Sequence, residues 1–275
     1  MTPTRKIAAT LLTAAVALSL SACAGSGAPA APAAPAAPAA ETAPASASTL
    51  EGSITVFAAA SLKSTFTELA DEFESSNPGA TVELNFAGSS DLVTQITEGA
   101  PVDVFASADE KNMAKLTDAT LIEPDAPVDF ATNVLEIAVP PSNPAGIVTF
   151  ADLAKPEAKT VVCAPQVPCG AATLAVETAT GVDIAPVSEE SSVTDVLGKV
   201  TSGEADAGLV YVTDIIAAGD AVTGIQFPES SEAVNTYPIA PVAASTNPEV
   251  AQAFIDFVTG AVGQDVLANA GFGRP

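Results

Sequence analysis

The sequence predicts an α/β protein built from two units, in each of which helices flank a mostly parallel sheet. One observation is a regular alternation of short apolar runs with stretches of helical periodicity, which is typical of parallel sheets covered by helices. Another is that this alternation restarts after about residue 133, which favours two α/β units over one large sheet. Residues 50–275 are also enough for one large or two modest cores.

The first 49 residues lie outside this pattern. Arg5 and Lys6 precede an apolar run, 7–20, that is shorter than the ~20 residues of a transmembrane helix, so residues 1–22 are predicted to be an export signal. The run ends in Leu-Ser-Ala-Cys, similar to the bacterial lipobox, in which the cysteine receives a lipid; the alternative is an ordinary signal peptide that contains a cysteine. Residues 23–49 are predicted to be lipidated Cys23 and an Ala/Pro-rich tether, because frequent proline interrupts helices.

The strands and helices of the first unit are predicted from hydrophobic periodicity and from residues that end a helix. Strands are predicted at 53–60, 81–87 and 102–107. Helices are predicted from Leu62 to the Asn77-Pro78-Gly79 breaker, at 90–98 and at 109–118.

The second unit repeats the alternation. Strands are predicted at 134–139, 160–164 and 207–211, and helices at 170–180, 192–202 and 213–218. A further helix at 247–259 has Asn247 as its expected N-cap and Pro248 in its first turn.

Charge and composition exclude several classes of function. The chain has 9 basic and 33 acidic residues, a net charge of −24, and loss of Arg5 and Lys6 with the signal would make it more negative. Such a chain repels nucleic acid and anionic lipid, so neither is an expected partner. Histidine, the commonest general base and metal ligand, is absent. Because the overall charge is strongly negative and gives an anion no long-range attraction, any anion site must rely on local donors.

Two cysteines remain once Cys23 is assigned to the lipid. Cys163 and Cys169 enclose a five-residue loop, and in an exported protein such a pair suggests a disulfide. Two free thiols are the alternative, because spacing alone does not establish the geometry.

Hydroxyl groups and free amides gather where predicted strands give way to helices. Ser61, Gly88-Ser89-Ser90, Cys169-Gly170 and Ser191-Ser192-Val193 each open a helix, and Tyr211 ends a strand. Open parallel sheets bind ligands at this edge, where helix N-termini point. N-capping alone would also explain a serine at any single junction.

The order of these motifs resembles that of the periplasmic molybdate-binding proteins of ABC transporters. The resemblance covers about residues 51–275. It rests on Ile54-Thr55-Val56-Phe57-Ala58-Ala59-Ala60-Ser61-Leu62, Phe86-Ala87-Gly88-Ser89-Ser90, Gly99-Ala100-Pro101-Val102-Asp103-Val104-Phe105, Ser107-Ala108-Asp109, Val167-Pro168-Cys169-Gly170, Gly208-Leu209-Val210-Tyr211, Tyr237-Pro238-Ile239-Ala240 and Ala270-Gly271-Phe272-Gly273.

The resemblance implies a fold, a ligand and a set of ligand-binding residues. It implies the two-lobed fold of periplasmic binding proteins, with lobe one at 50–132 plus 242–275, lobe two at 133–241, and crossings near Asn133 and Tyr237-Pro238. Molybdate or tungstate would be held between the lobes without a direct protein–metal bond and without a cofactor. The implied donors are Ser61, Ser89, Cys169, Val193 and Tyr211. At Cys169 the family has a small residue such as alanine, but the backbone donor survives the change.

The expected function is therefore that of a monomeric, lipid-anchored, extracytoplasmic binding protein that delivers an oxyanion to an ABC permease. Within the same class, a receptor for sulfate or another tetrahedral oxyanion is the main alternative. A ferric-ion receptor is disfavoured because such sites favour clustered tyrosines, and the chain has only two tyrosines in total. An enzyme would have to use Ser61 with Lys63, which are placed poorly for a nucleophile and its base. A passive surface lipoprotein is supported only by the tether.

Overall fold

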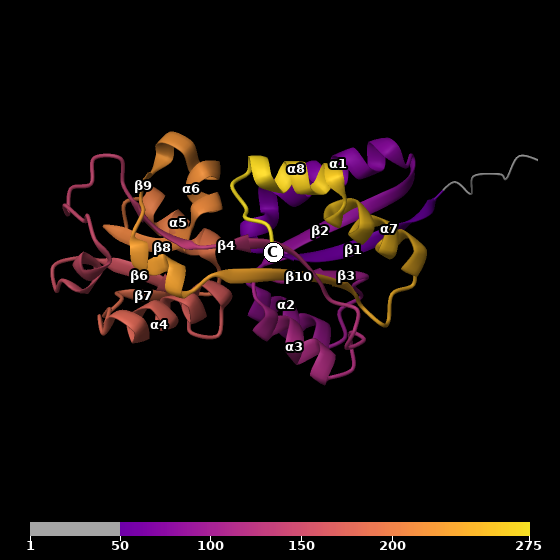
Figure 1. Ribbon diagram of the computed structural model, residues 1–275, viewed down its shortest axis with the longest axis horizontal. Coiled ribbons are helices and arrows are strands. Elements are labelled where there is room, and N and C mark those ends of the chain that lie inside the picture. Colours follow the sequence, from indigo (N-terminus) through magenta and orange to yellow (C-terminus); the bar gives the residue numbers. More distant parts are fainter. Residues whose placement is uncertain (1–49) are drawn as a thin grey trace, which may run out of the picture. The chain divides into compact units, whose positions relative to one another are not determined.

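Two five-stranded sheets organise the computed structural model, which describes residues 50–275; the predictions for residues 1–49, including Cys23, lie outside the described residues. Each sheet with its helices forms one lobe (Figure 1). The sheets are mixed, because each combines parallel strands with antiparallel neighbours.

Lobe one contains the sheet with the strand order β2-β1-β3-β10-β4. Its strands are β1 (Glu51–Ala59), β2 (Gly79–Ala87), β3 (Val104–Ala106), β4 (Val128–Asn133) and β10 (Asn235–Pro241). Its helices are the short 3-10 turn η1 (Ala60–Leu62), α1 (Lys63–Ser76), α2 (Ser89–Thr97), α3 (Glu110–Asp118), α7 (Pro248–Thr259) and α8 (Ala261–Asn269). Strands β1, β2 and β3 are parallel, and β10 is antiparallel to both β3 and β4.

Lobe two contains the sheet with the strand order β7-β6-β8-β5-β9. Its strands are β5 (Leu135–Val139), β6 (Thr160–Cys163), β7 (Ser188–Glu190), β8 (Ala207–Tyr211) and β9 (Thr223–Ile225). Its helices are α4 (Pro168–Thr180), α5 (Val193–Thr201) and α6 (Val212–Ala218), with short 3-10 turns η2 (Phe150–Ala154), η3 (Gly219–Ala221) and η4 (Pro228–Glu232).

The lobes have separate cores. In lobe one, Phe66, Phe73 and Phe254 pack edge-on beneath α1 and α7, while α2 and α3 cover the opposite face of the sheet with a second cluster around Phe105 (Figure 1). Lobe two has one core, formed mainly by its own aliphatic side chains. Burial of each large apolar side chain contributes about 1.5–3 kcal/mol to folding, so each lobe has its own source of stability.

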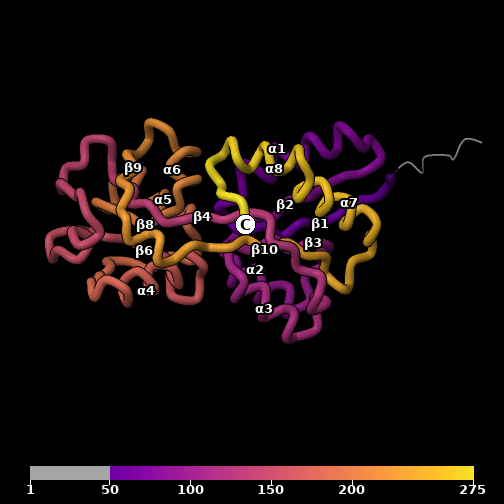
Figure 2. The backbone as a smooth tube through the Cα atoms, viewed as in Figure 1, coloured from indigo at the N-terminus to yellow at the C-terminus, as the bar shows by residue number. Residues whose placement is uncertain are grey.

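The chain crosses between the lobes twice, once from β4 to β5 and once between β9 and β10 (Figure 2). The first crossing follows Asn133, where it was expected. The second differs from the prediction, which kept residues up to 241 in lobe two: β10 pairs with β3 and β4 and so belongs to lobe one. The sequence of β10 does not indicate which sheet it joins, and only its antiparallel pairing reveals its lobe. Tyr237 and Pro238 therefore lie inside lobe one.

Candidate functional site

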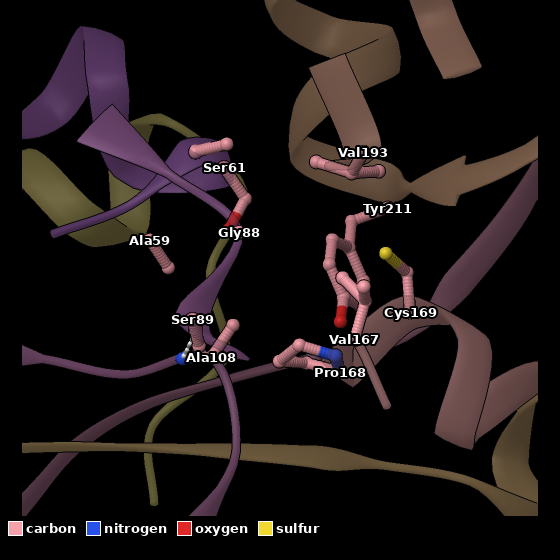
Figure 3. Close-up of a pocket in the computed structure, with 11 residues that line it drawn as sticks. Ala59, Ser61, Gly88, Ser89, Ala108, Val167, Pro168, Cys169, Val193 and Tyr211 are labelled. Atoms are coloured by element: carbon pink, nitrogen blue, oxygen red, sulfur yellow. Dashed lines mark hydrogen bonds between the residues drawn. The ribbon is translucent and has the colours of Figure 1, made fainter. Parts of the chain in front are cut away.

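A small pocket lies where the two lobes meet, and all five residues predicted to bind an oxyanion line it (Figure 3). The pocket is small in this structure: its volume of about 10 Å³ is room for a group of roughly the size of one water molecule. Lobe one contributes Ala59, Ala60, Ser61, Gly88, Ser89 and Ala108. Lobe two contributes Val167, Pro168, Cys169, Val193 and Tyr211.

The fold brings these residues together because each lies at the end of a strand or in the segment that follows it. Ser61 comes after β1, Ser89 is the first residue of α2 after β2, and Val193 is the first residue of α5 after β7. Cys169 is the second residue of α4, and Tyr211 ends β8. The first amides of a helix have no partner within it, and the helix dipole adds partial positive charge there. Strand ends from both lobes therefore direct backbone donors at one point.

Each of the two serine hydroxyls contacts another polar group of the protein. The amide of Ala108 donates to Ser89 Oγ at 3.0 Å. Ser61 Oγ lies 3.0 Å from Tyr237 Oη, and the buried tyrosine hydroxyl is able to donate to it. A hydroxyl carries one hydrogen, so a serine that accepts from the protein keeps that hydrogen for another partner. Ser89 thus keeps its hydrogen for a ligand in the pocket, and Ser61 does so when Tyr237 is the donor of their shared hydrogen bond.

Tyr211 presents a third hydroxyl. Its side chain is 1% exposed, and among residues 50–275 its Oη has no hydrogen-bond partner. Burial raises the pKa of the Tyr211 phenol well above its ordinary value, so the group keeps its proton. Figure 3 shows the ring between Val193 and Pro168 on the lobe-two side of the pocket. A buried hydroxyl without a partner is costly, and a ligand in the pocket that Tyr211 lines would supply that partner.

The disulfide that the sequence suggested is present between Cys163 and Cys169, whose Cα atoms are 5.6 Å apart. It connects the end of β6 to the first turn of α4, and both cysteines are buried. The bridge therefore fixes the first turn of α4, in which Cys169 lines the pocket.

No charged side chain lines the pocket within residues 50–275. Lys63 lines two neighbouring pockets instead, and in the described part of the chain no group of three or more His, Cys, Asp or Glu side chains is placed to hold a metal ion. The carboxyl of Asp214 lies behind the site, where its Oδ2 accepts from the Tyr211 amide at 2.9 Å. Burial raises the pKa of Asp214 to about 7. The pocket thus offers neutral donors and no formal charge.

The sequence pattern of the family described as bacterial extracellular solute-binding protein matches residues 54–273 of this chain. The chain belongs to this family. Among the solute-binding proteins it resembles is the molybdate-binding protein ModA of Mycobacterium tuberculosis strain H37Rv, with 49% identity over 81% of this chain and 85% of that protein. ModA of Escherichia coli is 32% identical over 81% of this chain and 89% of its own length.

Solved structures of solute-binding proteins share the two-lobed fold. The periplasmic molybdate-binding protein of Azotobacter vinelandii matches with a TM-score of 0.70 and 25% identity, covering 81% of this chain and 99% of that one. The sulfate-binding protein SubI of M. tuberculosis matches with a TM-score of 0.69 at 23% identity, over 82% of this chain and 87% of its own, and so shows the fold alone.

Sequence reasoning missed other residues of this solute-binding site. Gly88 and Ala108 lie in motifs that were recognised, but neither was predicted to touch the ligand. Tyr237 was expected only near a crossing, whereas its hydroxyl contacts Ser61. These roles depend on contacts between distant segments, and a one-dimensional pattern carries no signal for them.

Proposed function

We propose that this solute-binding protein captures molybdate outside the cytoplasm and delivers it to an ABC importer. The observation that carries the proposal is an uncharged pocket lined by hydroxyl donors: Ser89 accepts from the Ala108 amide and keeps its own hydrogen, Tyr211 keeps its proton, and no carboxylate lines the wall. An oxyanion without a proton can accept from every one of these groups. The relationship to ModA proteins supports molybdate as the particular ion.

The same pocket chemistry argues against phosphate. At neutral pH phosphate retains at least one proton, which needs an acceptor, and no carboxylate lines the pocket to accept it. Sulfate has the charge and shape of molybdate and differs chiefly in size, so it remains the second candidate. We propose that tungstate, which matches molybdate in charge and shape, binds as well.

Ligand-dependent melting tests this function. Molybdate and tungstate should raise the melting temperature of the full chain, sulfate should raise it less, and phosphate should leave it unchanged, since a ligand stabilises only the state that binds it. Ser89→Ala should reduce the shift at a given molybdate concentration, because it removes one hydrogen-bond donor from the pocket. Ser90→Ala is the matched control, because Ser90 is also buried in the same helical turn but does not line the pocket. The proposal would be excluded if ferric citrate raised the melting temperature, or if none of the oxyanions did.

We infer that the protein is a carrier and not an enzyme, and that it acts as a monomer without a cofactor. In the structure the Ser61 hydroxyl pairs with Tyr237 rather than with Lys63, which argues against a Ser–Lys nucleophile. The strongly negative charge argues against a nucleic-acid partner.

We also propose that Cys23 carries a lipid that holds the protein at the membrane surface. The lipobox-like Leu20-Ser21-Ala22-Cys23 supports this, as does the name of a relative 25% identical over 80% of this chain, a putative substrate-binding lipoprotein of Bacillus subtilis. Within residues 50–275 no helix is long and apolar enough to cross a membrane. Cys23→Ala should move the protein from the detergent phase to the aqueous phase on partitioning. Unchanged partitioning would disprove lipidation at this residue.

A further inference from the structure

Gly88 occupies a backbone position that does not itself require glycine. It is the N-cap of α2, directly after β2, with φ −60° and ψ 141°. Any L-residue adopts these angles without strain, and α2 receives no side-chain cap from this position. The reason for a glycine must therefore lie in its surroundings.

Those surroundings belong to the other lobe. A Cβ atom at Gly88 would overlap the carbonyl oxygen of Ser191 and would lie 3.2 Å from its carbonyl carbon and 3.6 Å from Val167 Cγ1. Gly88 is in lobe one, whereas Ser191 and Val167 are in lobe two. Because the Ser191 oxygen is backbone, it has no rotamer by which to avoid the overlap. Among the glycines that the structure describes, only Gly88 would meet the backbone of the other lobe in this way.

We propose that Gly88 is the residue that permits the two lobes to close on the oxyanion, a role that rests on the proposed function. The Gly88–Ser191 contact sets how closely the lobes approach at the edge of the pocket. A methyl group there would hold them apart by on the order of 1 Å at this point. Each lobe would still fold, because the overlap exists only between lobes.

The position of the contact explains why this separation matters for binding. Gly88 directly precedes Ser89, and Ser191 lies two residues before Val193. Figure 3 shows Gly88 and Val193 facing each other across the pocket from opposite lobes. The contact therefore fixes the spacing between lobe-one donors and lobe-two donors. Hydrogen bonds weaken steeply with distance, so an anion in the separated pocket would be held well by one lobe at a time.

The test compares two glycine-to-alanine variants of the full chain. Gly88→Ala adds the obstructing methyl group, and Gly198→Ala is the control, because a Cβ at Gly198 in α5 meets nothing within 4 Å. Calorimetry and stopped-flow dissociation with molybdate should show about 100-fold weaker binding and faster release for Gly88→Ala, since at least one charge-assisted hydrogen bond is lost. Gly198→Ala should bind as the wild type does.

Hydrogen exchange measures the closure of the two lobes directly. In the wild type, molybdate should protect amides on both facing edges, 88–92 and 191–196, whereas in Gly88→Ala only one edge should gain protection. Without ligand, the two proteins should melt within about 5 °C of each other, because a small change at a helix N-cap is the only effect expected inside lobe one.

Three results would overturn the role of Gly88. They are wild-type affinity and release in Gly88→Ala, protection of both edges in that variant, and a much larger loss of ligand-free stability, which would place the overlap inside lobe one. If the wild type itself bound no oxyanion, the proposed function would fail and closure on an oxyanion would fail with it. Binding by the wild type and equally by Gly88→Ala would instead reject the closure role alone.

Discussion

At the scale of single residues, the pocket is defined by which hydrogen atoms its hydroxyls have left to donate. Ser89 accepts from a backbone amide and so has one hydrogen for a ligand, and Ser61 has one when Tyr237 donates to it. Tyr211 contributes a phenol whose pKa is raised by burial. Neutral donors of this kind bind an anion without the cost of burying a fixed counter-charge.

Tyr211→Phe separates binding from stability. The variant should bind molybdate tenfold or more weakly, which corresponds to the ~1.5–3 kcal/mol typical of a hydrogen bond to a charged group. Without ligand it should be at least as stable as the wild type, because the change removes a buried hydroxyl that has no partner among residues 50–275. Titration calorimetry and denaturant unfolding measure the two effects. Equal affinity in the variant would show that the phenol does not reach the anion.

At the scale of elements, strand-to-helix junctions carry the site, and two of them are reinforced. The disulfide connects β6 to the first turn of α4. Asp214, in the first turn of α6, accepts from the amide of Tyr211 and so holds the β8–α6 junction. Each reinforcement acts on a backbone segment that lines the pocket.

Loss of the disulfide should reduce affinity more than it reduces folding. The bridge closes a short loop, for which the chain-entropy model gives ~2–3 kcal/mol, so Cys163→Ser/Cys169→Ser should still fold. The Cys169 amide would no longer be held in place before the ligand arrives, and binding would have to supply that ordering. Molybdate titration and ligand-free melting are the measurements. A double variant with full affinity and a much lower melting temperature would make the bridge a purely structural one.

The buried carboxyl of Asp214 should make stability depend on pH. Its pKa rises from 3.8 to about 7 through burial, an effect that the hydrogen bond from the Tyr211 amide partly opposes. Between pH 4 and 7 the folded state therefore holds a proton that the unfolded state has lost, so the free energy of unfolding should fall as pH rises and level off above pH 7. Asp214→Asn should flatten this slope in denaturant titrations across that range. An unchanged slope would show that Asp214 is ionised in the folded protein.

At the scale of the whole molecule, periodicity predicted most of the fold because strand and helix patterns are local. The predicted strand at 207–211 coincides with β8, and the predicted helix at 90–98 overlaps α2 within one residue. Strands β4, β7, β9 and β10 were not predicted, and the second lobe boundary was wrong, because sheet membership depends on pairing between distant segments.

The site was predictable to the same extent and for the same reason. Serines at helix starts are visible in the sequence, and the order of the motifs added Cys169, Val193 and Tyr211. The Ser61–Tyr237 contact spans 176 positions, and the Gly88–Ser191 contact exists only once the lobes meet. Asn247 illustrates the limit locally: it precedes α7 as expected, but its side-chain amide donates to Ser53 and does not cap the helix.

The separate cores of the two lobes affect how the protein unfolds as well as how its lobes close. Lobe one and lobe two each bury their own apolar clusters and are joined by two strand crossings. An anion bound to donors from both lobes contributes its binding free energy only while both remain folded. The bound anion thereby couples the unfolding of the two lobes into a single transition. Scanning calorimetry should show this transition sharpening as molybdate is added.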